Sequence, residues 1–401
     1  MKLVNIDELK TGDIIARSLY YPFGGIMIKA GVKLDRFIIT KLKEIGYKYV
    51  YVYDEQIGDI EYYETMDELS KVSLTKKIRE TFSQLRNEVG LLIKTERWGK
   101  ISHQEINKFL EKEKLFISTV PKVQLNFIQD VTTIIEKLVS ETEYILSILT
   151  IKSASQYLYE HSIEVTIKSL LLGKKLGLTR GELIELGVGA LLHDIGYSLI
   201  PENIVNKKEK LTEHEKKLLH LHPTLGYTIL KNHPLVSILS AHVAYQHHEQ
   251  QNGKGYPRGL RGRNKFIHKK EYQFESEPKI HRYAEIVAVA DYYDLMLTDT
   301  PFGKALNVDE AYTKLKNAGG SILNKEILDV FLEFVPVYPI GTQVIFTNGK
   351  LRGFKGVVTR NFPGELTKPL IKVHRGPKNE NIAHPFEVDL RKENFAIKII
   401  P

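Results

Sequence analysis

The sequence contains no cysteine, and this excludes several kinds of site at the outset. Disulfide bonds, iron–sulfur clusters and zinc sites built from thiolates cannot form, and the absence suits a reducing compartment. The N-terminal residues, Met-Lys-Leu-Val-Asn-Ile-Asp-Glu, also lack the apolar core of a signal peptide. We therefore expect a cytoplasmic protein.

Long apolar runs are missing as well. A membrane-spanning helix needs about 20 apolar residues, and the longest candidate, residues 284–297, is interrupted by Glu285, Asp291 and Asp294. This segment is therefore predicted to be a buried helix of a globular protein. No membrane span is expected.

The sequence does contain enough apolar residues for a core, together with an excess of positive charge. A chain of 401 residues with 42% hydrophobic residues predicts two to four domains. The net charge of +8 favours anionic partners in general. Because the basic residues are scattered rather than clustered, a soluble basic protein without such a partner is an equally good interpretation. A nucleic-acid partner is not expected.

Residues 1–62 are predicted to form a small mixed α/β domain. Asp35 can cap a helix that Gly46 ends. On either side of this helix, residues 14–20 and 48–53 are predicted to be strands. No pair of residues in this region has catalytic spacing, so we interpret it as an input or interaction domain.

Residues 63–150 are expected to be a helical linker or dimerisation region. Helical periodicity is present at 66–89, 102–115 and 123–149. Amphipathic helices of this kind could join two copies into a homodimer through residues 66–150, or could simply cover the next domain. The sequence favours neither alternative.

The C-terminal residues 337–401 differ in character, and Pro336 and Pro339 mark the boundary. They are predicted to form a small β domain that resembles a barrel or a sandwich. Its strands are expected at residues 343–346, 355–359, 370–373 and 395–400.

The region between these flanks, residues 151–336, is predicted to be helical, and its most informative feature is the pair His193-Asp194. Leu183, Leu186 and His193 recur at helical spacing, so the histidine should point inward with the leucines. A buried carboxylate beside a buried imidazole is costly unless both find partners, and a metal ion would satisfy both. Taken alone, such a pair more often caps a helix.

Other histidines and one further carboxylate occupy similar places in this region. The full set of candidate ligands is His161, His193, Asp194, His222, His247, His248 and Asp291. A single inward histidine is usually a hydrogen-bonded core residue, whereas Asp291 lies among apolar neighbours and needs a cation or several donors. So many inward or helix-terminal groups in one region favour a metal centre. Without cysteine, histidine and carboxylate suit Fe, Mn or Zn.

The adjacency of His247 and His248 bears on the number of ions. Neighbouring residues on a helix diverge by about 100°, so the two imidazoles would serve two ions, or one ion if the helix ends there. Asp194 has two oxygens and could bridge. Two metals about 3.5–4 Å apart would polarise a bridging hydroxide and stabilise both the attacking and the leaving oxygen of a phosphodiester. The expected chemistry is phosphohydrolysis.

Residues from His161 to about 335 resemble the HD-GYP domain, a subgroup of the HD metal-dependent phosphohydrolases. The matching pieces occur in the family's order: His161-Ser162, His193-Asp194-Ile195-Gly196, Ile200-Pro201, His222-Pro223 with Gly226, His247-His248-Glu249, Asn252-Gly253-Lys254-Gly255-Tyr256-Pro257 with Gly259-Leu260, and Val289-Ala290-Asp291. The flanking regions also resemble those often attached to this domain. The implied fold is mainly α: an all-helical HD-type bundle between the N-terminal α/β unit and the C-terminal β-barrel-like domain.

The resemblance implies hydrolysis of cyclic di-GMP to linear pGpG or GMP, with two or three divalent metals, often iron or manganese. It makes all seven candidates metal ligands, with Asp194 bridging and with His193 and Asp194 at the catalytic centre. The substrate contacts that we expect are Tyr197, Lys254, Gly255, Tyr256, Pro257 and Arg258.

Several positions depart from the family pattern. Tyr197 replaces the lysine that usually follows His-Asp-x-Gly, and Glu285 stands where an arginine is frequent. Residues 298–302 supply no arginine, and Tyr157 offers no carboxylate for a third ion. Residues 261–280 form a longer, basic insertion, which could be a lid over the substrate or a surface loop.

These departures leave three hypotheses open. The first is a cyclic di-GMP phosphodiesterase that acts through the metal-bridging hydroxide, in which Tyr197 is a guess for the general acid. The second is a metal-containing sensor that binds a cyclic dinucleotide with little turnover. The third is a related HD phosphohydrolase with a different nucleotide substrate.

Overall fold

The computed structural model describes most of the chain. The described residues are 1–21, 26–58, 60, 66–89, 125, 127–140, 157–207, 209–268, 277–298 and 304–400. The helix expected at 102–115 lies outside these ranges, as do both ends of the helix expected at 123–149. The described helices are long enough and apolar enough for a globular core, but none could cross a membrane.

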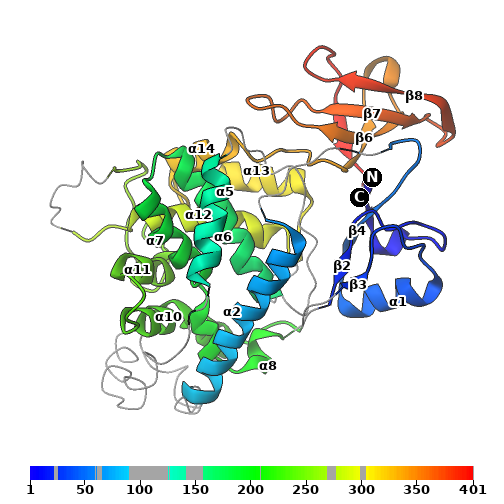
Figure 1. Cartoon of the computed structure of the whole chain (residues 1–401). Coiled ribbons are helices and arrows are strands. Elements are labelled where there is room, and N and C mark those ends of the chain that lie inside the picture. The colour runs from blue at the N-terminus through cyan, green and yellow to red at the C-terminus, as the bar shows by residue number, and fades with distance from the viewer. Residues whose placement is uncertain are drawn as a thin grey trace.

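The N-terminal region contains the expected helix between short strands (Figure 1). Helix α1 (Arg36–Ile45) begins where Asp35 Oδ1 accepts a hydrogen bond from the Ile38 amide, and it ends at Gly46, which has a φ of 91°. Strand β1 (Lys2–Asn5) pairs antiparallel with β4 (Tyr49–Val52). The strand expected at 14–20 is reduced to β2 (Leu19–Tyr20), which pairs with β3 (Ile26–Ile28).

The middle of the chain is a helical body. Its longer helices are α6 (Tyr157–Lys175), α7 (Arg180–Leu191), α10 (His222–Lys231), α11 (Ile238–Gln246), α12 (Arg282–Met296), α13 (Val308–Ala318) and α14 (Lys325–Leu332). Shorter ones are η5 (Ile195–Leu199), α8 (Glu202–Val205) and α9 (Glu213–Leu219). These elements confirm the prediction of a helix-rich chain.

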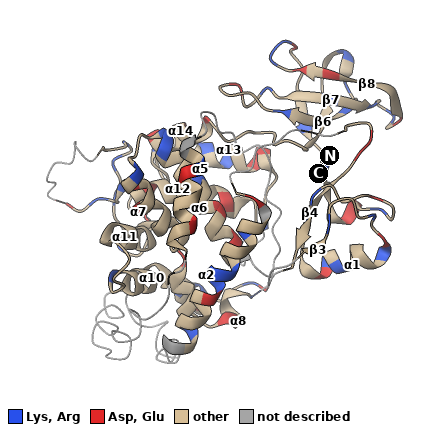
Figure 2. Ribbon diagram, viewed as in Figure 1, with Lys and Arg blue, Asp and Glu red and all other residues tan. Residues whose placement is uncertain are grey.

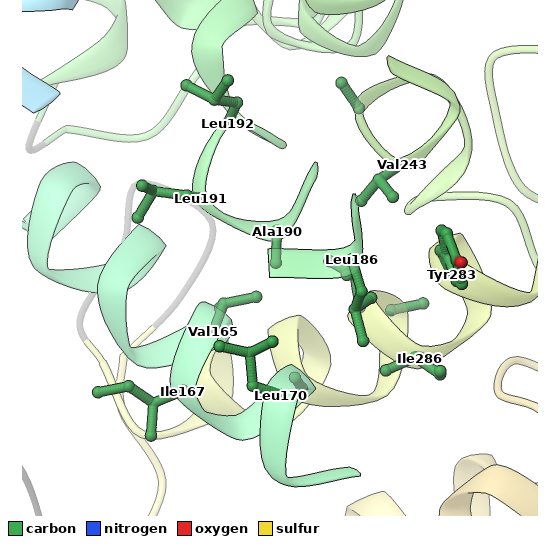
Figure 3. Close-up of a cluster of buried hydrophobic side chains, with 14 of the residues drawn as sticks. Val165, Ile167, Leu170, Leu186, Ala190, Leu191, Leu192, Val243, Tyr283 and Ile286 are labelled. Atoms are coloured by element: carbon green, nitrogen blue, oxygen red, sulfur yellow. The ribbon is translucent and has the colours of Figure 1, made fainter. Parts of the chain in front are cut away.

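Helices α6, α7 and α12 form the centre of this body (Figure 3). The side chains of Leu170 on α6, Leu186 on α7 and Ile286 on α12 are fully buried. Residues 161–170 of α6 and 282–291 of α12 are buried on every side, which is the pattern of a helix at the middle of a core. Polar residues on these two helices therefore need partners inside the protein.

Helices α2 (Glu68–Val89) and α5 (Ile128–Ser140) cover this core. Leu74 and Phe82 of α2 and Ile134 of α5 are buried in the same hydrophobic cluster as the residues of α6 and α7. The outer face of α2 carries intermingled acidic and basic residues (Figure 2). In the described ranges the apolar faces of these helices are used within the chain, and the homodimer stays a prediction.

The C-terminal region is an antiparallel sheet of five strands. They are β5 (Gln343–Phe346), β6 (Lys355–Arg360), β7 (Leu370–Arg375), β8 (Asn381–Asp389) and β9 (Ile397–Ile399), in the order β8-β7-β6-β5-β9. Four of these strands were expected. Strand β8 was missed because it is largely exposed and contains Pro385, so it lacks the apolar alternation of a buried strand.

The expectation of a barrel was wrong, because the sheet is open. Strands β8 and β9 lie at opposite edges and do not pair with each other in the part of the chain that the structure describes. With only three residues, β9 is too short to offer a full ladder to a closing strand. Pro385 also has no amide hydrogen to donate, which suits an edge strand.

The N-terminal region and the C-terminal sheet contact each other directly, and the labelled chain ends lie side by side (Figure 1). The Leu3 amide donates to the Gly341 carbonyl over 2.9 Å, and Gln343 Nε2 donates to the Leu3 carbonyl over 2.9 Å. Tyr51 is fully buried in a cluster with Met1 and Ile340. Segments from the two ends of the chain therefore share one interface.

Replacing Gly341 by alanine should weaken this interface. Gly341 has a φ of 87°, and an added Cβ would lie 2.7 Å from Tyr51 Cε1. Gly320 is the matched control, because its φ is 85° and nothing lies within 4 Å of its added Cβ. We expect backbone strain to lower the free energy of unfolding of both variants by about 1–2 kcal/mol. The clash should lower that of Gly341→Ala by a further ~1–3 kcal/mol. Equal losses for the two variants in urea denaturation would contradict the prediction.

Candidate metal centre

The His193-Asp194 pair lies where two elements meet. Helix α7 begins with a capping box made by Thr179 and Glu182 and ends at Leu191, so His193 follows it in a turn and Asp194 precedes η5. His193 is fully buried, and Asp194 is 6% exposed. Both residues are buried just beyond the end of a central helix, where the sequence predicted an inward-pointing His193.

The other expected ligands come from four more helices. His161 lies near the start of α6, and His222 is the first residue of α10. His247 directly follows α11, and Asp291 lies within α12. All seven expected side chains are buried except that of His248, which is 22% exposed. Residues separated by up to 130 positions in the sequence thus meet inside one body.

The cluster consists of two groups that share Asp194. Asp194, His222, His247 and His248 form one group, and His161, His193 and Asp194 form the other. In each group the potential ligand atoms lie within 4.8 Å of one another. Asp291 extends the second group, since its Oδ1 is 3.0 Å from His161 Nε2. This is the arrangement that two cations with one bridging carboxylate would require.

Backbone carbonyls fix the tautomers of three imidazoles. Nδ1 of His193 donates to Ala190, Nδ1 of His222 to Leu219, and Nδ1 of His247 to the carbonyls of Val243 and Ala244. A carbonyl can only accept, so each Nδ1 carries a proton, and in the neutral form of each ring the lone pair of Nε2 faces the cluster.

The Nε2 lone pairs of His222 and His247 lie close together and favour a cation beside them. His222 Nε2 and His247 Nε2 lie 3.2 Å apart. When both rings are neutral and protonated on Nδ1, no proton lies between these two nitrogens. A divalent cation coordinated by both would remove the repulsion, so the residues present fit a metal ion. The donor set of imidazoles and carboxylates suits Fe, Mn or Zn.

The charges of the groups also match a cation site. Burial lowers the pKa of His222 to about 3, so this imidazole is neutral at physiological pH. Burial opposes ionisation of Asp194, but the surrounding histidines, His193 foremost, hold its pKa well below the usual range. Burial disfavours the protonated form of His161, yet hydrogen bonds to Asp291 and Asp294 raise its pKa to about 9. A cation must therefore displace a proton from His161.

Asp294 and Lys168 belong to the site and were missed in the sequence. Asp294 Oδ2 is 2.6 Å from His161 Nδ1, and Lys168 Nζ is 3.1 Å from Asp294 Oδ1. Asp294 was interpreted only as a charge that interrupts an apolar run. Its position three residues after Asp291 places both carboxylates on one face of α12, and that spacing was the available signal.

The Gly-Tyr-Pro segment packs against the ligands. The Tyr256 ring stacks on His248, with centroids 4.8 Å apart, and also on His220, with centroids 4.3 Å apart. Tyr197 stacks on His222, with centroids 4.1 Å apart. A Cβ on Gly255 would lie 2.4 Å from the Gln250 amide nitrogen, so only glycine fits here. The two tyrosines therefore form part of the wall of the cluster.

Two expected substrate contacts lie on the exposed side of this segment. Lys254 and Arg258 are exposed, and the loop between them is held by Glu249, whose carboxylate accepts from the amides of Arg258 and Leu260. Pro257 completes the loop. The substrate roles of Tyr197, Lys254, Gly255, Tyr256, Pro257 and Arg258 stay predictions.

The described part of the 261–280 insertion contacts other parts of the helical body, and its role as a lid or a surface loop stays a prediction. Phe266 is buried, and its amide donates to Glu326 of α14. His268 lies beside Gly177, just after α6 ends. His161 is near the other end of α6, about 20 Å away at 1.5 Å per residue. His268 therefore lies near the C-terminal end of α6, at the opposite end of this helix from His161.

Comparison with known proteins agrees with this site. Residues 158–296 match the family model described as HD domain. The chain is 31% identical over 256 residues to a cyclic di-GMP phosphodiesterase of Pseudomonas aeruginosa, covering 64% of this chain and 57% of that protein. It is 29% identical to a cyclic di-GMP phosphodiesterase of Thermotoga maritima, covering 59% of each chain. The chain thus spans less than two thirds of the length of these relatives.

More distant similarities accompany these. A 3′3′-cGAMP-specific phosphodiesterase of Vibrio cholerae is 30% identical over 40% of this chain and 32% of that protein. The solved structure of an HDG"Y"P protein from Bdellovibrio bacteriovorus aligns with a TM-score of 0.41 at 18% identity, covering 82% of this chain and 97% of that one.

Residues 158–296 of the helical body thus match the HD domain model, and all seven candidate ligands lie within this stretch. The resemblance to the HD-GYP family is therefore supported by this match and by the two cyclic di-GMP phosphodiesterases. The pieces His193-Asp194 and Gly255-Tyr256-Pro257, which carry this resemblance, both lie at the candidate metal centre.

Replacing Gly196 by alanine should disrupt the centre. An added Cβ would lie 2.0 Å from the carbonyl oxygen of His222, so η5 would have to separate from α10. We expect a loss of about 3 kcal/mol in unfolding free energy, the upper end for single substitutions, together with loss of Mn²⁺ binding in titration calorimetry. Gly181→Ala is the control, because nothing lies within 4 Å of its Cβ. A folded Gly196→Ala protein that binds Mn²⁺ normally would contradict the prediction.

Glu285 should make stability depend on pH. Burial raises its pKa from 4.5 to about 7, although Gln251 donates a hydrogen bond to it. Between these values the native chain keeps a proton that the unfolded chain has lost. The contribution of protonated Glu285 to the free energy of unfolding is therefore fully present below pH 4.5 and is lost as pH rises through about 7.

The comparison with Glu285→Gln isolates this effect. Between pH 4.5 and pH 8 the free energy of unfolding of the native protein should fall by on the order of 2–3 kcal/mol relative to that of the variant. Urea denaturation at several pH values measures the difference. The exposed Glu277→Gln is the control, and a constant difference between the native protein and Glu285→Gln would refute the assignment.

Proposed function

We propose that this chain is a metal-dependent phosphodiesterase that hydrolyses cyclic di-GMP to linear pGpG, to GMP or to both. The observation that carries the proposal is the pair of ligand groups joined through Asp194 inside an HD domain. The names of the relatives from Pseudomonas aeruginosa and Thermotoga maritima supply the substrate class.

Two divalent ions would be held by the two groups. His161, His193, Asp194 and Asp291 would bind one ion, and Asp194, His222, His247 and His248 would bind the other. Iron or manganese fits this nitrogen and oxygen donor set, and zinc is the next choice. When bound, such ions polarise a phosphodiester and activate water for attack on phosphorus.

The chain's own residues orient and enclose the reacting groups. The carbonyls of Ala190 and Leu219 hold His193 and His222 with Nε2 directed at Asp194, so the centre is arranged before substrate arrives. Tyr197 and Tyr256 cover ligand imidazoles and exclude water from one side of the cluster. His193 and Asp194 would stand closest to the reaction, since both groups include Asp194.

Phosphate recognition must differ from the family pattern. The usual lysine is replaced by Tyr197, whose ring is occupied by stacking on His222. Lys254 and Arg258 are exposed cations on the loop that carries Tyr256, so they are the described residues best placed to meet phosphate oxygens at the entrance.

Two alternatives have their own support. Tyr197 stands where the family usually has a lysine, and this replacement favours a sensor that binds a cyclic dinucleotide without turnover. The similarity to the 3′3′-cGAMP-specific enzyme favours a related phosphodiesterase with a different cyclic dinucleotide as substrate.

Product analysis with the full chain distinguishes these functions. The purified protein, reconstituted with Mn²⁺ or Fe²⁺, is incubated separately with cyclic di-GMP and with 3′3′-cGAMP, and the products are separated by chromatography. We expect pGpG or GMP from cyclic di-GMP. Binding of cyclic di-GMP without product would identify a sensor, and hydrolysis of 3′3′-cGAMP alone would identify the related enzyme.

The variant Asp194→Ala should lose turnover completely while it keeps its fold, because both ligand groups depend on this carboxylate. The control Asp329→Ala removes an exposed carboxylate on α14 and should turn over normally. Circular dichroism checks the fold of both variants. Normal turnover by Asp194→Ala would overturn the proposed function.

A further inference from the structure

A chain of alternating charges runs from the surface helix α2 to the metal centre. Lys71 Nζ lies 3.3 Å from Glu164 Oε1, and Glu164 Oε2 lies 2.8 Å from Lys168 Nζ. Lys168 Nζ lies 3.1 Å from Asp294 Oδ1, and Asp294 Oδ2 lies 2.6 Å from His161 Nδ1. Each link joins a carboxylate to a lysine or to the His161 imidazole.

The inner links are buried. The side chains of Lys168, Glu164 and Asp294 are 7%, 8% and 3% exposed, whereas Lys71 is 17% exposed. Buried ion pairs contribute little net stability, because desolvation consumes most of the attraction. Stability is therefore a poor explanation for placing a lysine at position 168, in the middle of a core helix.

His161 differs from the other ligands in how its Nδ1 is held. His193, His222 and His247 lie at or beyond helix ends, where the preceding turn offers carbonyls as acceptors. His161 lies inside α6, where the carbonyls of the preceding turn serve the helix itself. A side-chain carboxylate, that of Asp294, takes the role of the carbonyl.

A carboxylate can turn about its bonds, whereas a backbone carbonyl cannot. Asp294 therefore needs a second contact to keep Oδ2 directed at His161. Lys168 supplies this contact by donating to the other oxygen, Oδ1. Glu164 holds the lysine from the opposite side.

We propose that Lys168 is a positioning residue for the metal ligand His161 and that it acts through Asp294. This inference rests on the metal centre of the proposed function. By fixing Asp294, Lys168 keeps His161 Nδ1 as the donor and its Nε2 as the ligand atom. The ion of the His161 group would then depend on a residue that never touches it, whereas the ion of the His222 group would not.

The test is Mn²⁺ binding by the full chain in the absence of nucleotide, measured by titration calorimetry and by the metal content after dialysis. Lys168→Met keeps the aliphatic stem and removes the charge. Loss of an outer ligand contact typically costs 10–100-fold in metal affinity, so we expect one of two Mn²⁺ ions to bind about 10–100-fold more weakly. Lys71→Met, at the outer end of the chain of charges, should bind both ions within about twofold of the native protein.

A double variant separates positioning from charge compensation. Lys168→Met alone leaves Glu164 and Asp294 without their shared cation, so its melting temperature should fall. Glu164→Gln with Lys168→Met removes one charge of each sign and should recover part of that loss while Mn²⁺ binding stays weak. Lys168→Arg, which can contact both carboxylates, should restore binding. If the lysine variants do not fold, Asp294→Asn tests the same link with a single changed atom.

Mn²⁺ binding by the native protein and by the variants distinguishes a failure of the proposed function from a failure of the positioning role of Lys168. If the native protein binds no Mn²⁺, the proposed function itself fails. If the native protein binds two ions and the folded double variant or Asp294→Asn binds both with native affinity, the positioning role of Lys168 is overturned.

Discussion

The structure is organised around the cost of placing ionisable groups in an apolar interior. Asp194 is nearly buried and has its pKa held low by the imidazoles around it, and each of those imidazoles is in turn oriented by a neighbour. A group of this kind is tolerated only where every polar atom has a partner. Helices α6, α7 and α12 provide the surrounding core, and the ends of α7, α9 and α11 provide carbonyl partners for the imidazoles.

The position of the ligands follows from where helices end. The last carbonyls of a helix lack partners within it, and histidines just beyond those carbonyls can use them. His193, His222 and His247 all do so. The same backbone geometry that terminates each helix therefore selects the tautomer that can bind a cation. His161 lies within a helix and needs Asp294 instead.

Much of this site could be predicted from the sequence. The seven candidate ligands were predicted because histidine and aspartate stood out among apolar residues at helical spacing, and the structure brings all seven side chains together. Asp294 had a signal in its spacing from Asp291, but Lys168 could not be identified in this way, since its contact with Asp294 depends on α6 and α12 lying side by side. The route of the insertion depends equally on tertiary contacts, such as that between Phe266 and Glu326. Strand β8 escaped because an exposed edge strand has no apolar pattern, and barrel closure depends on which edges pair.

The interface between the two ends of the chain has a consequence for synthesis on the ribosome. Tyr51 and Ile340, which share one cluster, are separated by 289 positions. At a synthesis rate of 5–20 residues per second, roughly 15–60 s pass between the emergence of Tyr51 and that of Ile340. During this interval the N-terminal region can assemble its own small core around Leu42 and Val50, but the surface around Tyr51 has to wait for its partner. The apolar patch that later joins the chain ends thus stays exposed on the nascent protein throughout this interval.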